Sequence, residues 1–237
     1  MLILASNSPR RRQLLAWFGV DFVVQTADID ESRLPGETPQ IYTTRVAAEK
    51  AWKIAAGRDQ QDIILAADTT VAMQSPEDKK WKILGKPADE DEAQAMLRIL
   101  RGKTHQVFTG VAVTYGQRKA INGNTQRVEI KKLDETQIHS ALSVTDVLMR
   151  VYSDQEMLDY IKSGDPLDKA GASALQHKGF HPVESLTECF TSVVGLPVCL
   201  VDTMLRKEGI IPQLTLPDSC RSSQNSGCEV FRQIFPD

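Results

Sequence analysis

The sequence predicts an α/β fold in which a mixed sheet forms two lobes beside a cleft. Short apolar segments typical of strands alternate with segments whose apolar residues recur at helical spacing. Glycine, proline and small polar residues separate these segments, as expected at turns and helix ends. The chain has 237 residues, of which 41% are hydrophobic and 25% are charged. It can therefore bury a core of ordinary size, and it is neither collagen-like nor wholly disordered.

The first half of the chain alternates between strands and helices. Its predicted elements are a strand at 2–5, a helix at 10–18, a strand at 22–25, a helix at 40–56, a strand at 63–67, and a hairpin of 71–73 with 81–84. Pro9 suits the start of the first helix, and Gly19 and Gly57 suit the ends of the two helices. Residues 63–67 are apolar throughout, as in a strand that is buried on both faces, and Asp68 follows at the C-terminal end of this strand.

The second half continues the alternation. Its predicted elements are a helix at 89–102, strands at 105–115 and 145–152, a helix at 153–163 and a last helix at 197–207. Asp89 is a good N-cap, and Ser153 with Glu156 forms a capping box. Pro197 suits the first position of the last helix.

Three segments are too polar to join the core. Residues 116–140 are expected to form an extended hairpin or an excursion, and residues 165–179 a glycine-rich, charged loop. Residues 208–237 carry several prolines and a cluster of Ser, Asn and Gly, so we expect a weakly ordered tail there. One domain should therefore span residues 1–207.

Charge and composition exclude several classes of partner. The net charge of −3 gives no global positive field for nucleic acid, so any polyanion site must be local. The longest apolar runs, residues 63–67 and 196–201, are far shorter than the roughly 20 residues of a membrane-spanning helix. The N-terminus lacks the features of a secretory signal, and the four cysteines have no metal-ligand spacing. We therefore expect a cytoplasmic protein with reduced thiols and with neither a membrane nor a nucleic acid as partner.

The sharpest local indication of a ligand lies at the start of the first helix. Ser8 is a good N-cap, yet Arg10, Arg11 and Arg12 follow at the positive end of the helix dipole. Each cation is unfavourable there by roughly 0.3–1 kcal/mol at low salt, so the cluster makes most sense if an anion binds. Serine hydroxyls, backbone N–H groups and guanidinium groups together suit a phosphate. A solvated basic turn is the alternative that the local pattern leaves open.

Two further side chains are candidates for the cleft. Asp68 follows a buried strand, and ligands of open α/β sheets gather beyond the carboxyl ends of strands. Its carboxylate could bind a divalent metal, activate water, or do both. Lys50 lies at the edge of the apolar face of its helix, where its ammonium could enter the cleft. The alternatives are that Asp68 only begins a turn and that Lys50 extends to solvent.

Weaker candidates lie in loops. Lys86 sits in a rigid turn and could point at a phosphate or at solvent, and Glu31 is a loop carboxylate with no pattern of its own. The small residues around Lys169 either let the backbone approach a ligand or merely connect two elements. The amide of Gln176 both donates and accepts, as reading a base edge requires. Walker, Rossmann and G-x-S-x-G fingerprints are missing from the sequence, which argues against P-loop NTPases, dehydrogenases and common hydrolases.

A series of short motifs resembles the Maf-type nucleoside triphosphate pyrophosphatases. In chain order the motifs are residues 2–11 (LILASNSPRR), 49–51 (EKA), 67–69 (ADT), 84–87 (LGKP), 102–105 (GKTH), 109–111 (TGV), 168–171 (DKAG) and 194–197 (VGLP). Any one of them is weak evidence, but the ordered set is specific and covers nearly all of the predicted domain.

The resemblance implies an elongated α/β fold with a central cleft, similar to inosine triphosphatases. It also implies hydrolysis of a nucleoside triphosphate between its α and β phosphates with a divalent cation, Mg²⁺ or Mn²⁺. Asp68 would accept the proton of water, and Glu31 would help Asp68 to hold the metal. Base specificity would depend on Arg10, Thr69 and Gln176. The residues implied to hold phosphates are Ser8, Arg11, Lys50, Lys86 and Lys169. A homodimer is a further implication of the resemblance.

Two branches of this family differ after the central strand. Asp68-Thr69 resembles the dTTP/UTP branch, whereas the 7-methyl-GTP branch carries Asp-Gln at this point. We therefore expect hydrolysis of dTTP, UTP and modified pyrimidine nucleotides to the monophosphate and pyrophosphate. The alternatives are a 7-methyl-GTP-type pyrophosphatase and a nucleotide-binding regulator of septum formation. The chain departs from the family at residues 171–177 (GASALQH), which lack the usual tyrosine and final glycine.

Overall fold

The computed structural model describes residues 1–117, 119–121, 124–126, 138–173, 179–187 and 189–213. In chain order the elements are β1 (Leu2–Leu4), α1 (Pro9–Ala16), β2 (Phe22–Val24), α2 (Pro39–Ala55), β3 (Ile63–Gln74), β4 (Trp81–Leu84), α3 (Glu90–Leu100), β5 (Thr104–Tyr115), β6 (Lys119–Ile121), β7 (Asn124–Gln126), β8 (Ile138–Met149), α4 (Asp154–Lys162), two 3-10 helices (Asp165–Asp168 and Ala170–Ala172), β9 (Val183–Leu186), α5 (Phe190–Val194) and α6 (Val198–Lys207). Within these residues, no helix combines the length and the apolar character needed to cross a membrane.

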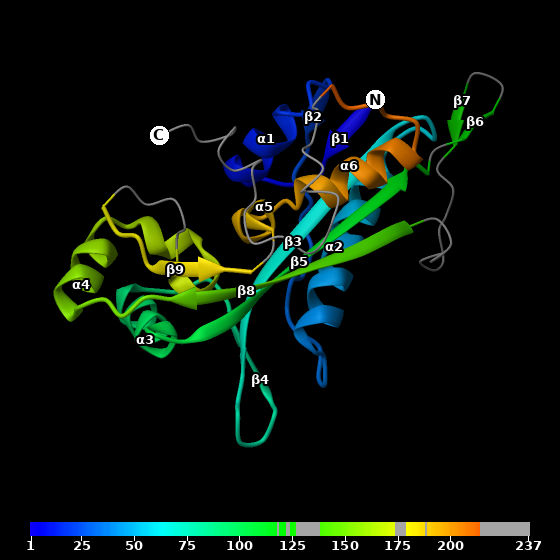
Figure 1. Cartoon of the computed structure of the whole chain (residues 1–237). Helices are drawn as coiled ribbons and strands as arrows, with labels where there is room; N and C mark the ends of the chain where they lie inside the picture. The colour runs from blue at the N-terminus through cyan, green and yellow to red at the C-terminus, as the bar shows by residue number, and fades with distance from the viewer. Residues whose placement is uncertain (118, 122–123, 127–137, 174–178, 188, 214–237) are drawn as a thin grey trace.

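A seven-stranded sheet runs through the molecule in the order β2-β1-β3-β5-β8-β9, with β4 also paired to β3 (Figure 1). β1 is parallel to β2 and β3, whereas β3, β5, β8 and β9 pair antiparallel. The mixed sheet expected from the sequence is therefore confirmed. β3, β5 and β8 have 12 residues each, so they are long enough to carry both lobes.

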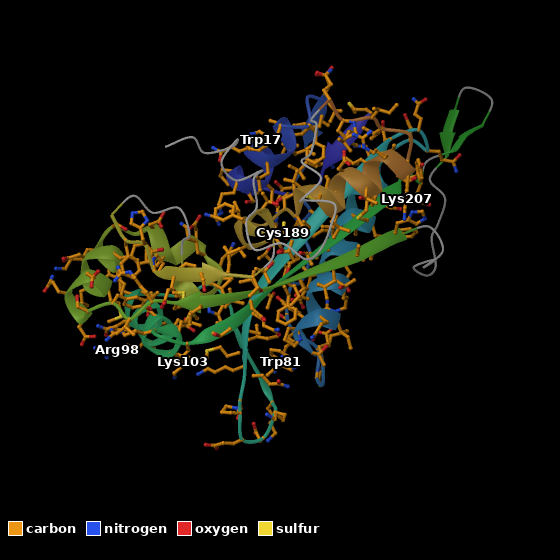
Figure 2. All side chains as sticks on the ribbon, viewed as in Figure 1. Trp17, Trp81, Arg98, Lys103, Cys189 and Lys207 are labelled. Carbon is orange, nitrogen blue, oxygen red and sulfur yellow. The ribbon has the colours of Figure 1, made fainter. Side chains whose placement is uncertain are left out.

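Helices cover the sheet differently in the two lobes (Figure 1). In the first lobe α2 packs on one face, and α1, α5 and α6 pack on the other. In the second lobe α3, α4 and the second 3-10 helix pack against the opposite ends of the long strands. Side chains crowd both faces of the sheet, and the labelled Trp17, after α1, and Trp81, in β4, lie in different parts of the molecule (Figure 2).

The close approach of α2 to the sheet depends on a glycine in β5. A Cβ atom at Gly110 would lie 2.7 Å from the carbonyl oxygen of Thr43 in α2, closer than real Cβ contacts allow. Ala47 and Ala51, on the same helix, are fully buried against the sheet. Small residues on both elements therefore bring α2, and with it Lys50, close to the centre of the sheet.

Local signals in the sequence located the starts of α1, α3 and α4 correctly. The side chains of Ser8 and Asp89 accept hydrogen bonds at the starts of α1 and α3, and Ser153 with Glu156 forms the capping box of α4. The last helix ends at Lys207 as expected, although Pro197 is its N-cap and not its first residue.

Several strand predictions were wrong. The strand expected to end at residue 67 continues to Gln74, because β3 pairs with β5 as far as Ala72. Its next residues include Thr69, Thr70 and Val71, which are β-branched and favour a strand. Asp68 therefore lies in the middle of β3 and not after it.

Other boundaries also differ. The strand predicted at 145–152 is β8, which begins at Ile138 and ends at Met149. The loop predicted at 165–179 contains two 3-10 helices, and both β9 and α5 were missed because each is too short to show a periodic pattern. Within the polar stretch 116–140, β6 and β7 form a small antiparallel pair. Most of the predicted tail, residues 214–237, lies outside the described residues.

Candidate functional site

The candidate site is a pocket of about 740 Å³ that residues of both lobes line. It lies where the pairing along one edge of β3 is interrupted. On this edge β1 pairs with residues 63–65 of β3, and β4 pairs with residues 71–74. No described strand pairs with the edge between these two stretches, so β3 is open to a ligand beside Asp68 and Thr69.

The pocket brings together residues that are far apart in the sequence. Of the ten predicted site residues, nine line it: Ser8, Arg10, Arg11, Glu31, Lys50, Asp68, Thr69, Lys86 and Lys169. The tenth, Gln176, lies outside the described residues. The individual roles expected of these residues stay predictions, but their common location is an observation.

Arg11 connects three parts of the first lobe. Its Nε donates to the carbonyl oxygen of Gly195 at 2.8 Å, its Nη2 to Oγ1 of Thr69 at 3.0 Å, and its Nη1 to Oγ of Ser6 at 3.3 Å. Burial lowers the pKa of Arg11, although the negative charges of Asp68 and Glu31 act to raise it. These contacts rule out a solvated basic turn for this arginine, since its side chain points into the molecule.

Lys50 joins the two carboxylates of the pocket. Its Nζ lies 2.8 Å from Oδ1 of Asp68 and 3.0 Å from Oε2 of Glu31. The side chains of Lys50 and Asp68 are 11% and 9% exposed, whereas that of Glu31 is 50% exposed. The alternatives of a lysine that extends to solvent and of an aspartate in a turn are therefore wrong.

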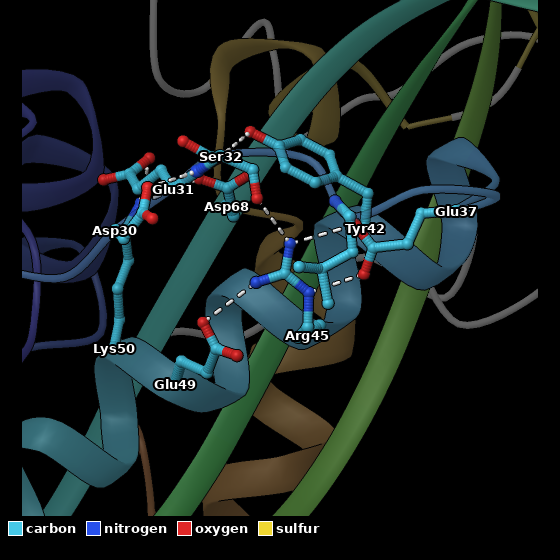
Figure 3. A network of polar contacts seen from close by, with 10 residues as sticks. Asp30, Glu31, Ser32, Glu37, Tyr42, Arg45, Glu49, Lys50 and Asp68 are labelled. Atoms are coloured by element: carbon cyan, nitrogen blue, oxygen red, sulfur yellow. Dashed lines mark hydrogen bonds and ion pairs between the residues drawn. The ribbon is translucent and has the colours of Figure 1, made fainter.

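The loop that carries Glu31 is fastened to α2 by Arg45 (Figure 3). Two nitrogens of the Arg45 guanidinium donate to the carboxylate of Glu37, at 2.5 and 2.9 Å, and Nη2 also donates to the carbonyl oxygen of Ser32 at 3.0 Å. Its Nη1 donates to Glu49 of the same helix at 3.0 Å. Arg45 thus holds the loop at two points, Ser32 and Glu37.

Tyr42 makes a second contact from α2 to this loop. Its hydroxyl donates to the carbonyl oxygen of Glu31 at 2.9 Å. Burial, together with the negative charges of Asp68 and Glu31, raises the pKa of Tyr42 to about 12, so the phenol keeps its proton at neutral pH. Tyr42 and Arg45 were not predicted from the sequence, because their partners lie in a loop without a regular pattern.

The second lobe brings further charges to the pocket. Lys169 Nζ lies 2.8 Å from Oδ1 of Asp165 and 2.6 Å from Oδ1 of Asp168, and Arg10 Nη1 of the first lobe lies 3.5 Å from Oδ2 of Asp168. Burial opposes the charged form of Asp168, but the hydrogen bond from Lys169 and the nearby cations outweigh it and lower its pKa. Arg10 and Asp168 therefore link the two lobes across the pocket.

A close backbone approach fixes the position of this charged segment. Gly171 donates its N–H to the carbonyl oxygen of Gly85 at 2.9 Å, which ties the segment of Lys169 to the turn of Lys86. Gly171 has a φ of +68°, and a Cβ there would lie 3.0 Å from the side chain of Val71. Glycine is favoured at this position for both reasons.

The part of the pocket within the second lobe has a partly apolar lining. Apolar side chains there include Val71, Val107, Val147 and Val183. His105 is buried beside them, and among the described residues its Nδ1 has no hydrogen-bond partner. Burial lowers the pKa of His105 to about 4, so the imidazole is neutral at pH 7. Its spacing to other histidines gave no reason to assign it to a site.

Comparison with known proteins agrees with this arrangement. A family model described as "Maf-like protein" matches residues 1–208. The chain belongs to the Maf-like family. A dTTP/UTP pyrophosphatase of Thermomicrobium roseum is 39% identical to this Maf-like chain over 235 residues, which cover 97% of the chain and 95% of the relative. Two further proteins of that name, from Myxococcus xanthus and Hahella chejuensis, are each 40% identical and cover 89% and 88% of the chain, and 93% and 92% of their own lengths.

The donor set of this Maf-like pocket suits a divalent cation only in part. Glu31 and Asp68 each place an oxygen within 3.0 Å of the same ammonium group, so the two carboxylates can converge on one cation. Within the described part of the chain, no group of three or more His, Cys, Asp or Glu side chains is placed to hold a metal. Two carboxylates leave positions open for phosphate oxygens and water, which is how Mg²⁺ is usually held.

Proposed function

We propose that this Maf-like chain hydrolyses dTTP and UTP to the nucleoside monophosphate and pyrophosphate. The observation that carries the proposal is the buried contact of Lys50 with Asp68 in a pocket that both lobes line with cations. A triphosphate needs several cations for its charge, and its hydrolysis needs a carboxylate that can take a proton from water. The names of the relatives support the choice of substrate.

The side chains divide the reaction between them. Arg11, Lys86 and Lys169 bind phosphate oxygens, and Ser8 adds its hydroxyl at the start of α1. Water forms a bond to the α phosphorus while the bond from this phosphorus to the bridging oxygen breaks, and pyrophosphate leaves. The proton of water passes to the carboxylate of Asp68, which Lys50 keeps oriented through Oδ1.

Glu31 and Asp68 are the residues that would hold a divalent cation, Mg²⁺ or Mn²⁺. When bound, such an ion neutralises charge on the triphosphate. Tyr42 and Arg45 keep Glu31 near Asp68 by fastening its loop to α2. Base specificity from Arg10, Thr69 and Gln176 and a homodimer remain predictions from the family resemblance, and a cytoplasmic location remains a prediction from the sequence.

The test is a nucleotide panel assayed for pyrophosphate with Mg²⁺ and with Mn²⁺. We expect turnover of dTTP and UTP, and a loss of at least about 100-fold in Asp68→Asn, since this variant removes the proton acceptor. Asp159→Asn is the matched control, because Asp159 is 61% exposed and does not line the pocket. A preference for 7-methyl-GTP would overturn the substrate assignment. No turnover of any nucleotide, with a biological effect that survives Asp68→Asn, would favour a regulator instead.

A further inference from the structure

Two threonines on neighbouring strands form a directional chain of hydroxyl groups beside the pocket. Thr69 of β3 and Thr109 of β5 are direct partners in the antiparallel ladder, and their Oγ1 atoms lie 3.0 Å apart. Thr109 Oγ1 also lies 2.8 Å from the carbonyl oxygen of Ser192, to which it donates. A hydroxyl has one proton and a carbonyl oxygen can only accept, so the proton of Thr109 is committed to Ser192. Thr69 must therefore be the donor in its contact with Thr109.

Arg11 makes a second hydrogen bond to the hydroxyl of Thr69. Its Nη2 donates to Thr69 Oγ1 at 3.0 Å, and its Nε is fixed by the carbonyl oxygen of Gly195 at 2.8 Å. A threonine hydroxyl has one proton and two lone pairs. The proton of Thr69 is used by Thr109 and one lone pair is used by Arg11, which leaves one lone pair. Thr69, which lines the pocket, can therefore only accept a hydrogen bond from a ligand.

We propose that Thr109 is a specificity-positioning residue, which keeps Thr69 an acceptor and so makes the pocket favour a base whose ring nitrogen carries a proton. Uracil and thymine present an N3–H donor, whereas N3 of cytosine is itself an acceptor. A lone pair of Thr69 that faces N3 of cytosine gives an unpaired contact, which disfavours that base. The inference rests on the proposed function and on the role in base specificity predicted for Thr69, and it assigns to Thr109 a part in distinguishing uracil and thymine from cytosine.

Thr109 acts through Thr69 and not by contact with the ligand. Its side chain is fully buried, and it does not line the pocket. Both residues are β-branched, so few rotamers are open to them and the direction of the chain is stable. The buried carbonyl oxygen of Ser192 fixes that direction, since no other proton arrangement satisfies both contacts of the Thr109 hydroxyl, with Thr69 and with Ser192.

The direct test compares kcat/KM for UTP and CTP in Thr109→Val and Thr109→Ser. In Thr109→Val the proton of Thr69 is released and can be donated to N3 of cytosine. We expect the ratio of UTP to CTP efficiency to fall by about tenfold, the worth of one hydrogen bond that changes from matched to unpaired. Thr109→Ser retains the hydroxyl and should keep the wild-type ratio. A purely structural effect would lower kcat/KM for UTP and for CTP by the same factor and leave their ratio unchanged.

A second measurement needs no variant, so it tests the required N3–H donor even if Thr109→Val does not fold. The wild-type protein is given UTP, 5-methyl-UTP and N3-methyl-UTP, of which only the last has lost the N3–H donor. We expect 5-methyl-UTP to match UTP and N3-methyl-UTP to be at least about tenfold poorer. Equal turnover of N3-methyl-UTP, or an unchanged ratio in folded Thr109→Val, would overturn the inference while UTP hydrolysis still upheld the proposed function. Absence of UTP hydrolysis would overturn both.

Discussion

Lys50 and Asp68 form an almost completely buried ion pair, with Nζ and Oδ1 2.8 Å apart. The pair joins the middle of α2 to the open stretch of β3, and Glu31 approaches the same ammonium from a loop at 3.0 Å. A charge that is removed from water in this way depends on its partner, because isolated charges are costly in a protein interior. The pair therefore links the stability of the fold to the site.

Lys50→Met should separate stability from activity. It leaves the carboxylate of Asp68 without its cation, so we expect the free energy of unfolding to fall by about 3 kcal/mol. Adding Asp68→Asn removes the stranded charge and should restore most of this loss, while pyrophosphate release stays absent in both variants. Urea unfolding and the pyrophosphate assay measure the two effects. If the loss in free energy of unfolding of the double variant equals the sum of the losses of the two single variants, Lys50 and Asp68 do not stabilise the fold as a pair.

Arg45→Met should loosen the loop that carries Glu31. The variant loses the hydrogen bonds to Glu37 and to the carbonyl oxygen of Ser32, and with them two attachments of the loop to α2. We expect the metal concentration for half-maximal activity to rise by about tenfold, as for other residues that support a metal ligand.

Hydrogen exchange provides an independent readout of the same change. The backbone N–H of Leu34 donates to Glu37, so it should exchange faster in Arg45→Met. Arg98→Met is the control, because Arg98 is 55% exposed, lies in a 3.7 Å pair with Asp154 and does not line the pocket. Unchanged metal dependence together with unchanged exchange of the Leu34 amide would refute the positioning role of Arg45.

Features that depend on residues close together in the chain, such as helix caps, were predicted from the sequence. Caps such as Ser153 with Glu156 are signals within one turn of a helix, and the structure contains them. Asp68 was expected at a strand end because its apolar run stops at residue 67, but the β-branched residues after it continue the strand, which pairs with β5 as far as Ala72. The family motifs placed the pocket residues together without showing how they touch.

The contacts within the site could not have been read from the sequence. Arg10 and Asp168 are 158 positions apart, and the chain of Thr69, Thr109 and Ser192 crosses three elements. Such contacts follow from the register of the strands and from helix placement. Hydrophobic periodicity indicates which face of a strand is buried, but it does not identify the partner strand or the place where a helix packs.

Gly110→Ala should displace α2 from the sheet. The added Cβ would lie 2.7 Å from the carbonyl oxygen of Thr43, and backbone cannot yield as a flexible side chain does. We expect a loss of about 1–3 kcal/mol from overpacking and a drop in activity, since Lys50 moves with the helix. Gly57→Ala is the matched control, because its new Cβ would meet nothing closer than 3.7 Å. Equal melting temperatures for the two variants would contradict this role of Gly110.

His105 should make the protein less stable as the pH falls from about 6.5 to about 4. Burial lowers the pKa of His105 to about 4 from its ordinary value of 6.5, so the unfolded chain binds the proton more readily in this window. The free energy of unfolding then decreases with falling pH, by at most about 3 kcal/mol, and His105 adds no pH dependence above 6.5. His105→Gln should flatten the profile of melting temperature against pH between these limits, whereas His181→Gln, at an exposed position, should not. Parallel profiles for wild type and His105→Gln would show that burial of a neutral imidazole does not set this dependence.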